Sequence, residues 1–126
     1  MIPKNMRVFI ASTPVHMGRS FAGLEKIVSD LGHDAESSSL LVVFFNRKKD
    51  KLKLFWRDES GQIIFYKRLN RGSFRVPDGE PGSKKLKIDR AELELILEGV
   101  VLPPRSVAAK IYSKKGREKA LLFLEK

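Results

Sequence analysis

Residues 51–74, KLKLFWRDESGQIIFYKRLNRGSF, decide the fold that we predict for this chain of 126 residues. Leu52, Leu54 and Trp56 alternate with their neighbours and therefore share one face of a strand over residues 51–56. The next four residues, DESG, predict a turn in which Gly61 is able to take a positive φ. Residues 62–67, QIIFYK, predict a second strand. The stretch is therefore a β-hairpin followed by a basic exit loop.

The sequence before the hairpin predicts more strands. Residues 40–45, LLVVFF, form a continuous apolar run that is typical of a strand buried on both faces. Residues 46–50, NRKKD, predict a turn, so three strands follow one another through short connections and should pair antiparallel. Residues 7–12, RVFIAS, predict a first strand that ends before Pro14. Residues 73–76 are predicted to add a further short strand, before a loop over residues 77–85.

Two amphipathic helices complete the predicted domain. Over residues 19–31, Leu24, Val28 and Leu31 recur at helical spacing, and Gly32 is placed to end the helix. A second helix is predicted to start at Asp89, which has capping-box spacing to Glu92, and to stop at Gly99. These patterns predict an α+β fold, with a mostly antiparallel sheet and two packed helices.

Length and composition predict one α+β domain over residues 1–104, followed by a basic extension over 105–126, predicted to be helical, after the Pro103–Pro104 break. The chain has no cysteine, and therefore no disulfide framework and no thiolate metal site. It shows neither a signal peptide nor an apolar run of about 18–20 residues that could span a membrane. We therefore expect a cytoplasmic protein, associated with the nucleoid when it is bound to DNA.

Charge is the strongest indication of a partner. The chain has 25 Lys and Arg against 15 Asp and Glu, a net charge of +10. A domain this basic favours a polyanion such as nucleic acid, because phosphate contacts release condensed counterions. Between Phe44 and Arg75 there are ten basic residues and three acidic ones. In an antiparallel meander the 46–50 turn and the exit after residue 67 lie at one end of the sheet, and the acidic turn of Asp58 and Glu59 lies at the other.

This geometry predicts a basic patch for phosphate contact at one end of the sheet. Its candidate residues are Arg47, Lys48, Lys49, Lys53, Lys67, Arg68, Arg71 and Arg75. The competing interpretation is that turns simply carry solvated charges. Aromatic residues interleave with the basic ones and could stack on bases. We expect Trp56 and Phe65 to belong to the core and Tyr66 to be half exposed.

The sequence does not predict an enzyme. His16 and His33 are the only histidines, and neither has the spacing of a zinc site. Asp50 and Asp58 flank one predicted strand and should lie at opposite ends of it, too far apart to share a metal ion. No glycine-rich loop matches a nucleotide-binding signature. We therefore expect no catalytic residue, no metal and no cofactor.

The sequence resembles the accessory proteins called TnpB of the insertion sequence 66 family, which are encoded beside the transposase of bacterial mobile elements. They are distinct from the RNA-guided nucleases that share the name. Two blocks carry the resemblance: D-x-L-K-L-x-W-x-D-x-x-G over residues 50–61, and Y-K-R-L-x-x-G-x-F over 66–74. Further matching residues are Met1, Ile2, Pro3, Arg7, Val8, Met17, Phe21, Gly23, Leu24, Phe44 or Phe45, Asn46, Arg47, Leu97, Glu98 and Gly99.

The resemblance covers about residues 1–100, and the chain departs from the family pattern at three places. It has His16 before the methionine and Gly18-Arg19 after it, Ala22 before the first-helix glycine, and Val76 after Phe74. The resemblance implies a transposition accessory protein with no established active site.

With the charge pattern, the resemblance predicts binding to DNA at the ends of the mobile element and assistance to its transposase. One alternative is a module that docks on the transposase without touching DNA. Another is binding to single-stranded RNA through Tyr66.

Overall fold

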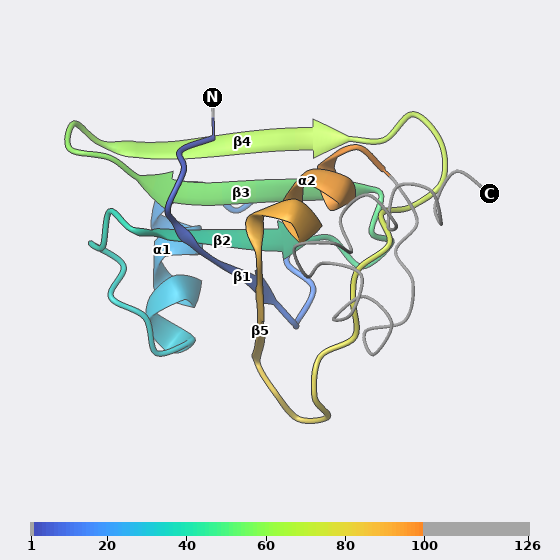
Figure 1. Cartoon of the computed structure of the whole chain (residues 1–126), viewed down its shortest axis with the longest axis horizontal. Helices are drawn as coiled ribbons and strands as arrows, with labels where there is room; N and C mark the ends of the chain where they lie inside the picture. Colours follow the sequence, from blue (N-terminus) through green and yellow to red (C-terminus); the bar gives the residue numbers. More distant parts are fainter. Residues whose placement is uncertain (1, 100–126) are drawn as a thin grey trace.

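Strand β2, Leu40–Phe45, forms the centre of the fold because all six of its apolar side chains are buried. In the computed structural model, which describes residues 2–99, β2 lies between β1 (Arg7–Ala11) and β3 (Lys51–Arg57). Two edge strands, β4 (Gln62–Arg68) and β5 (Lys85–Ile88), complete a sheet with the order β4-β3-β2-β1-β5 (Figure 1).

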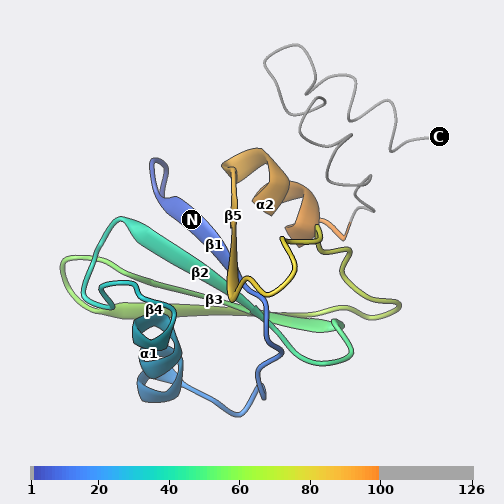
Figure 2. The same cartoon turned by 90° about the horizontal axis from the view of Figure 1, so that it is seen from below.

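The two helices cover opposite faces of this sheet (Figure 2). Helix α1, Phe21–Asp30, buries Leu24 and Val28 against a cluster that includes Phe44 and Phe55. Helix α2, Arg90–Leu97, contributes to the other, larger cluster, whose buried members are Val8, Ile10, Leu41, Val43, Phe45, Leu52, Leu54, Trp56, Phe74, Ile88, Leu93 and Ile96. Burial on both faces explains why β2 is continuously apolar, and the middle of β3 is likewise buried on both faces over residues 52–56.

The antiparallel meander is confirmed. β2 pairs antiparallel with β3, and β3 pairs antiparallel with β4 over seven consecutive residue pairs, from Lys51↔Arg68 to Arg57↔Gln62. β1 lies parallel to β2 and antiparallel to β5. The sheet is therefore mixed but mostly antiparallel, and the α+β class is as predicted.

Two details of the predicted strands were wrong. Residues 73–76 form no strand, because after β4 the chain has to cross from one edge of the sheet to the other and so lies beside no ladder partner. The fifth strand is β5 instead, where Leu86 and Ile88 join the α2-side core and which overlaps the predicted loop over residues 77–85 at Lys85. Gly61 does not take a positive φ, whereas Lys49 (φ 58°) and Gly72 (φ 72°) do.

The helix predictions are confirmed where the structure describes them. Asp89 caps α2: its side chain accepts from the Glu92 amide at 2.8 Å, and the Glu92 carboxylate accepts from the Asp89 amide at 3.3 Å. Gly99 follows α2 with φ 77°. The predicted extension over residues 105–126 lies outside the described residues.

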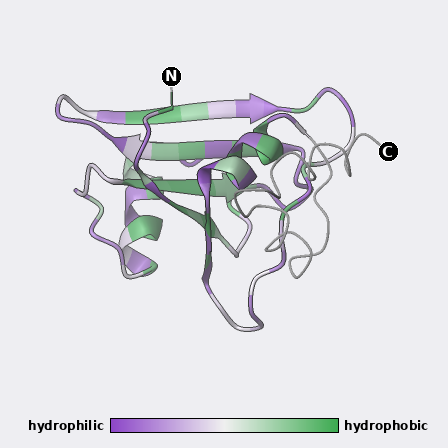
Figure 3. Cartoon of the chain, in the orientation of Figure 1, coloured by the Kyte–Doolittle hydropathy of each residue, from purple (hydrophilic) through white to green (hydrophobic). Residues whose placement is uncertain are grey.

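Hydropathy differs between the centre and the edge of the sheet: β2 is hydrophobic along its length, and the C-terminal end of β4 is hydrophilic (Figure 3). Within residues 2–99, neither helix has the length and apolar character needed to cross a membrane.

Candidate nucleic-acid interface

Two basic segments meet at one end of the sheet. The amide of Leu69 donates to the carbonyl of Asp50 at 2.8 Å, and the amide of Phe74 donates to the carbonyl of Lys49 at 2.6 Å. These two backbone hydrogen bonds join the exit loop of β4 to the 46–50 turn. The predicted proximity of the two segments is therefore confirmed at the level of the backbone.

Asn46 builds the turn that carries Arg47, Lys48 and Lys49. Its side-chain amide donates to Asp50 Oδ1 at 2.6 Å, and its Oδ1 accepts from the Lys51 amide at 3.1 Å. The hydrogen bond from Asn46 is the main reason that the pKa of Asp50 lies below its usual value. Asp50 is therefore an ionised structural acceptor inside a basic turn.

Six exposed cations make up the surface that we call the basic end. They are Arg47, Lys48, Lys49, Arg68, Arg71 and Arg75. Within the part of the chain that the structure describes, none of these six side chains forms a hydrogen bond or an ion pair. Their charges are thus available to an external anion.

Lys53 and Lys67, also candidates from the sequence, have partners within the fold. Lys53 is 8% exposed, donates to the carbonyl of Arg19 at 2.8 Å and lies over the Tyr66 ring, 4.9 Å from its centroid. Lys67 points to the α2 face and donates to the carbonyl of Leu97 in the last turn of α2. A cation there satisfies a helix-terminal carbonyl and complements the helix dipole. Both ammonium groups therefore have a hydrogen-bond acceptor within the fold.

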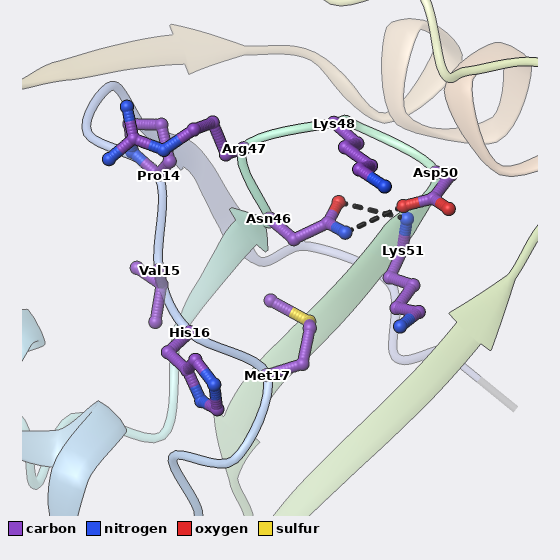
Figure 4. Close-up of a pocket in the computed structure, with 9 residues that line it drawn as sticks. All are labelled: Pro14, Val15, His16, Met17, Asn46, Arg47, Lys48, Asp50 and Lys51. Atoms are coloured by element: carbon purple, nitrogen blue, oxygen red, sulfur yellow. Dashed lines mark hydrogen bonds between the residues drawn. The ribbon is translucent and has the colours of Figure 1, made fainter.

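The connection between β1 and α1 forms one wall of a groove beside the 46–50 turn. The Val15 amide donates to the carbonyl of Phe45 at 2.8 Å, which holds residues 14–17 against the end of β2. The groove has a volume of about 480 Å³ and is lined by Pro14, Val15, His16, Met17, Asn46, Arg47, Lys48, Asp50 and Lys51. Figure 4 shows the Met17 side chain extending from this connection towards the turn. The groove therefore combines an apolar wall with a basic rim.

Sequence reasoning missed the contribution of this connection. Because β1 and β2 are parallel neighbours, the segments that follow them leave the sheet at the same end, which places residues 12–17 beside residues 46–50. Lys84 reaches the same end, since its carbonyl accepts from the Ser12 amide at 3.0 Å. The missing information was the pairing of β1 with β2, which short-range patterns do not encode.

The opposite end of the sheet has a different charge. Asp58 Oδ1 accepts from the hydroxyl and amide of Ser60 and from the Gly61 amide at 2.8–2.9 Å, and these bonds lower the pKa of Asp58, the Ser60 hydroxyl most. Glu59 beside it is exposed. The basic end and this acidic turn are thus separated by the length of β3 and β4.

No group of three or more His, Asp or Glu side chains is gathered as a metal site would require, within residues 2–99. The surface that the fold presents is cationic, and its chemistry is that of anion recognition.

These features define a class: a small α+β protein with exposed, unpaired cations collected at one end of a mostly antiparallel sheet. The chain belongs to a known family, because the family model described as IS66 Orf2 like protein matches residues 6–106. The resemblance seen in the sequence is thereby confirmed, and the chain is a transposition-associated protein.

One curated relative illustrates the family. The chain is 34% identical over 102 residues to "Uncharacterized protein y4hO" of Sinorhizobium fredii (strain NBRC 101917 / NGR234), an alignment that covers 79% of this chain and 87% of the relative. No solved structure matches the chain.

Proposed function

We propose that this protein binds DNA through the basic end and thereby assists the transposase of its insertion sequence in the cytoplasm. The observation that carries the proposal is the pair of backbone hydrogen bonds from Leu69 and Phe74 to the 46–50 turn. Through them, two groups of cations that lie 19–28 residues apart in the sequence form one surface. A shared surface suits a polyanion, since each phosphate needs its own cation at a fixed position.

The availability of the cations supports the same proposal. Arg57 and Arg90, which lie elsewhere, are engaged with Glu25 at 3.9 Å and Glu94 at 3.1 Å. The six cations of the basic end have no such partner among the described residues. Six like charges without an ion pair among the described residues repel one another, and bound phosphates relieve that repulsion.

Lys53 and Lys67 are excluded from the proposed contact set because their ammonium groups are used inside the fold. Lys51 is added, since it lines the groove beside Arg47 and Lys48. The proposed DNA contacts are therefore Arg47, Lys48, Lys49, Lys51, Arg68, Arg71 and Arg75.

A binding titration against element-end DNA and scrambled DNA of equal length, each at two salt concentrations, tests this function. We expect the affinities for both DNAs to fall as the salt concentration rises, because phosphate contacts dominate binding. If the protein also recognises the base sequence, it should bind element-end DNA more tightly than scrambled DNA. Absence of binding at the lower salt concentration, together with salt-insensitive capture by the purified transposase, would favour the docking module instead.

A further inference from the structure

The edge strand β4 lacks most of the features that protect sheet edges, since its charged residues, Lys67 and Arg68, are confined to its C-terminal end. It pairs with β3 over seven consecutive residues without a bulge, and it contains no proline. Its sequence QIIFYKR is apolar over residues 63–66. The opposite edge, β5, has only four residues, of which Lys85 and Lys87 are basic. Short, lysine-rich edges resist pairing with another chain, whereas long regular ones invite it.

The free hydrogen-bonding groups of β4 follow from its register. Asp58 donates to the Gly61 carbonyl and Leu69 donates to the Asp50 carbonyl, so residues 61 and 69 direct their backbone groups towards β3. In an antiparallel pair, residues that direct their backbone groups towards the partner strand alternate with residues that direct them away from it. The amides and carbonyls of Gln62, Ile64, Tyr66 and Arg68 therefore point outward. Within residues 2–99 no strand pairs with this side of β4, which runs along one margin of the sheet (Figure 1).

Exposed hydrophobic side chains accompany these backbone groups. Tyr66 is 50% exposed and Phe21 is 43% exposed, and they are the exposed large hydrophobic residues of the described part. Phe21 lies one helical turn before Glu25, and Glu25 accepts a hydrogen bond from the Gln62 side chain at 2.7 Å. Residues four apart share one side of a helix. Phe21 therefore lies on the same side of α1 as Glu25, which contacts the start of β4, and Tyr66 lies on β4 itself.

We propose that β4 pairs antiparallel with β4 of a second copy of this chain, which joins two sheets across a twofold axis at Phe65. Centring the pairing on Phe65 places Ile64 opposite Tyr66 of the second copy and Gln62 opposite Arg68. All four residues with outward backbone groups then find partners in both copies, which no shifted symmetric register achieves. The exposed Tyr66 ring is covered at the same time.

Charge complementarity favours a second copy as the occupant. In this register the acidic turn of one copy lies beside the exit loop of the other, so that Glu59 stands opposite Arg71 across the twofold axis. Asp58 likewise stands opposite Gly72. Both Glu59 and Arg71 are exposed and without an ion pair among the described residues. The pairing does not rest on DNA binding: Arg47, Lys48 and Lys49 remain outside the interface, whereas Arg68 and Arg71 of the basic end lie at its two ends.

The mass of the full-length protein in solution, measured by analytical ultracentrifugation over a concentration series, tests the proposal. We expect a monomer–dimer equilibrium for the wild type and for Tyr66→Phe, which keeps the ring. Tyr66→Glu should be monomeric, because it places two carboxylates in the joined sheet, while the nearby Lys53 ammonium keeps the folded monomer stable. A wild type that is monomeric at every concentration, or a Tyr66→Glu variant that still dimerises, overturns it.

Disulfide trapping tests the register, and the cysteine-free sequence leaves a single reporter thiol. Phe65→Cys should cross-link two copies, because its Cα atoms would lie about 4.5 Å apart across a non-hydrogen-bonded pair, within disulfide range. Tyr66→Cys should not, since its two Cα atoms would lie about 7–8 Å apart on a diagonal. Preferential cross-linking of Tyr66→Cys would overturn this register. Circular dichroism of both reduced variants checks that the fold is kept.

Discussion

At the scale of single residues, Asn46 does most to shape the basic end. Its two side-chain hydrogen bonds, to Asp50 and to the Lys51 amide, close the turn, and Lys49 completes it with a positive φ. The turn thereby holds Arg47, Lys48 and Lys49 in place without using any of their charges. Asp50, the acid within the turn, accepts the hydrogen bond from Asn46, while the exposed side chains around it are cationic.

His33 gives the fold a pH dependence. Its ring packs on Phe9, with centroids 4.4 Å apart, and burial, followed by the charges of Lys85 and Arg7, lowers its pKa. As the pH falls, His33 in the unfolded chain binds a proton near the ordinary histidine pKa of about 6.5, whereas His33 in the folded chain binds it only at a lower pH. The contribution of His33 to stability is thus full above about pH 6.5 and falls as the pH drops through the lowered folded-state pKa.

We predict that His33→Gln loses less stability than the wild type between pH 7 and pH 5. Urea unfolding at several pH values measures this difference directly. The contributions of the other titrating groups are the same in both proteins and cancel in the comparison. Equal slopes of unfolding free energy against pH would therefore show that the pKa of His33 does not change on folding.

At the scale of elements, the two helices begin differently. Asp89 forms a complete capping box with Glu92, whereas Ser20, at the N-cap of α1, makes no side-chain capping hydrogen bond. α1 is held instead by packing of Leu24 and Val28 and by the contact between Glu25 and Gln62.

Removing the two cap side chains should therefore have unequal effects. We predict that Asp89→Ala lowers the free energy of unfolding by about 1 kcal/mol, because the Glu92 amide at the start of α2 loses its acceptor. Ser20→Ala should change it by less than about 0.5 kcal/mol. Urea denaturation of both variants checks this, and equal losses would contradict the difference seen between the caps.

Lys67 and Arg68 are adjacent on β4 but point to opposite faces of the sheet. Lys67→Met should cost about 1 kcal/mol of stability, because it removes the donor to the Leu97 carbonyl, and should leave the salt dependence of DNA binding unchanged. Arg68→Met should leave stability unchanged and lower the salt slope by about one unit. Thermal unfolding and DNA titration of the pair separate a structural lysine from a phosphate contact, and a reversed pattern would refute the assignment.

Local sequence patterns predicted the helices and strands better than they predicted which strands pair with each other. Alternation in β3, the apolar run of β2 and the Asp89–Glu92 spacing are local patterns, and each corresponds to an observed element. The parallel pairing of β1 with β2 and the short edge strand β5 depend on contacts between distant residues, so no local pattern indicated them. For the same reason the burial of Lys53 was missed: its partner, the Arg19 carbonyl, lies 34 residues away.

At the scale of the whole molecule, the sheet separates charge along its strands. The basic end collects six exposed cations, and the turn that carries Asp58 and Glu59 lies at the other end of β3 and β4. An uneven distribution of this kind orients a molecule in the field of a polyanion. The proposed DNA binding therefore depends on where the charges lie rather than on the net charge of +10.

The salt dependence of DNA binding, compared between two variants of equal charge, tests this central claim most directly. Arg47→Ala/Arg68→Ala removes one exposed cation from each segment of the basic end. Lys4→Ala/Arg7→Ala removes two exposed cations at the opposite end, where β1 begins. We predict that the first variant lowers the slope of log affinity against log salt by about two units, while the control keeps the wild-type slope. Equal slopes for the two variants would contradict the account.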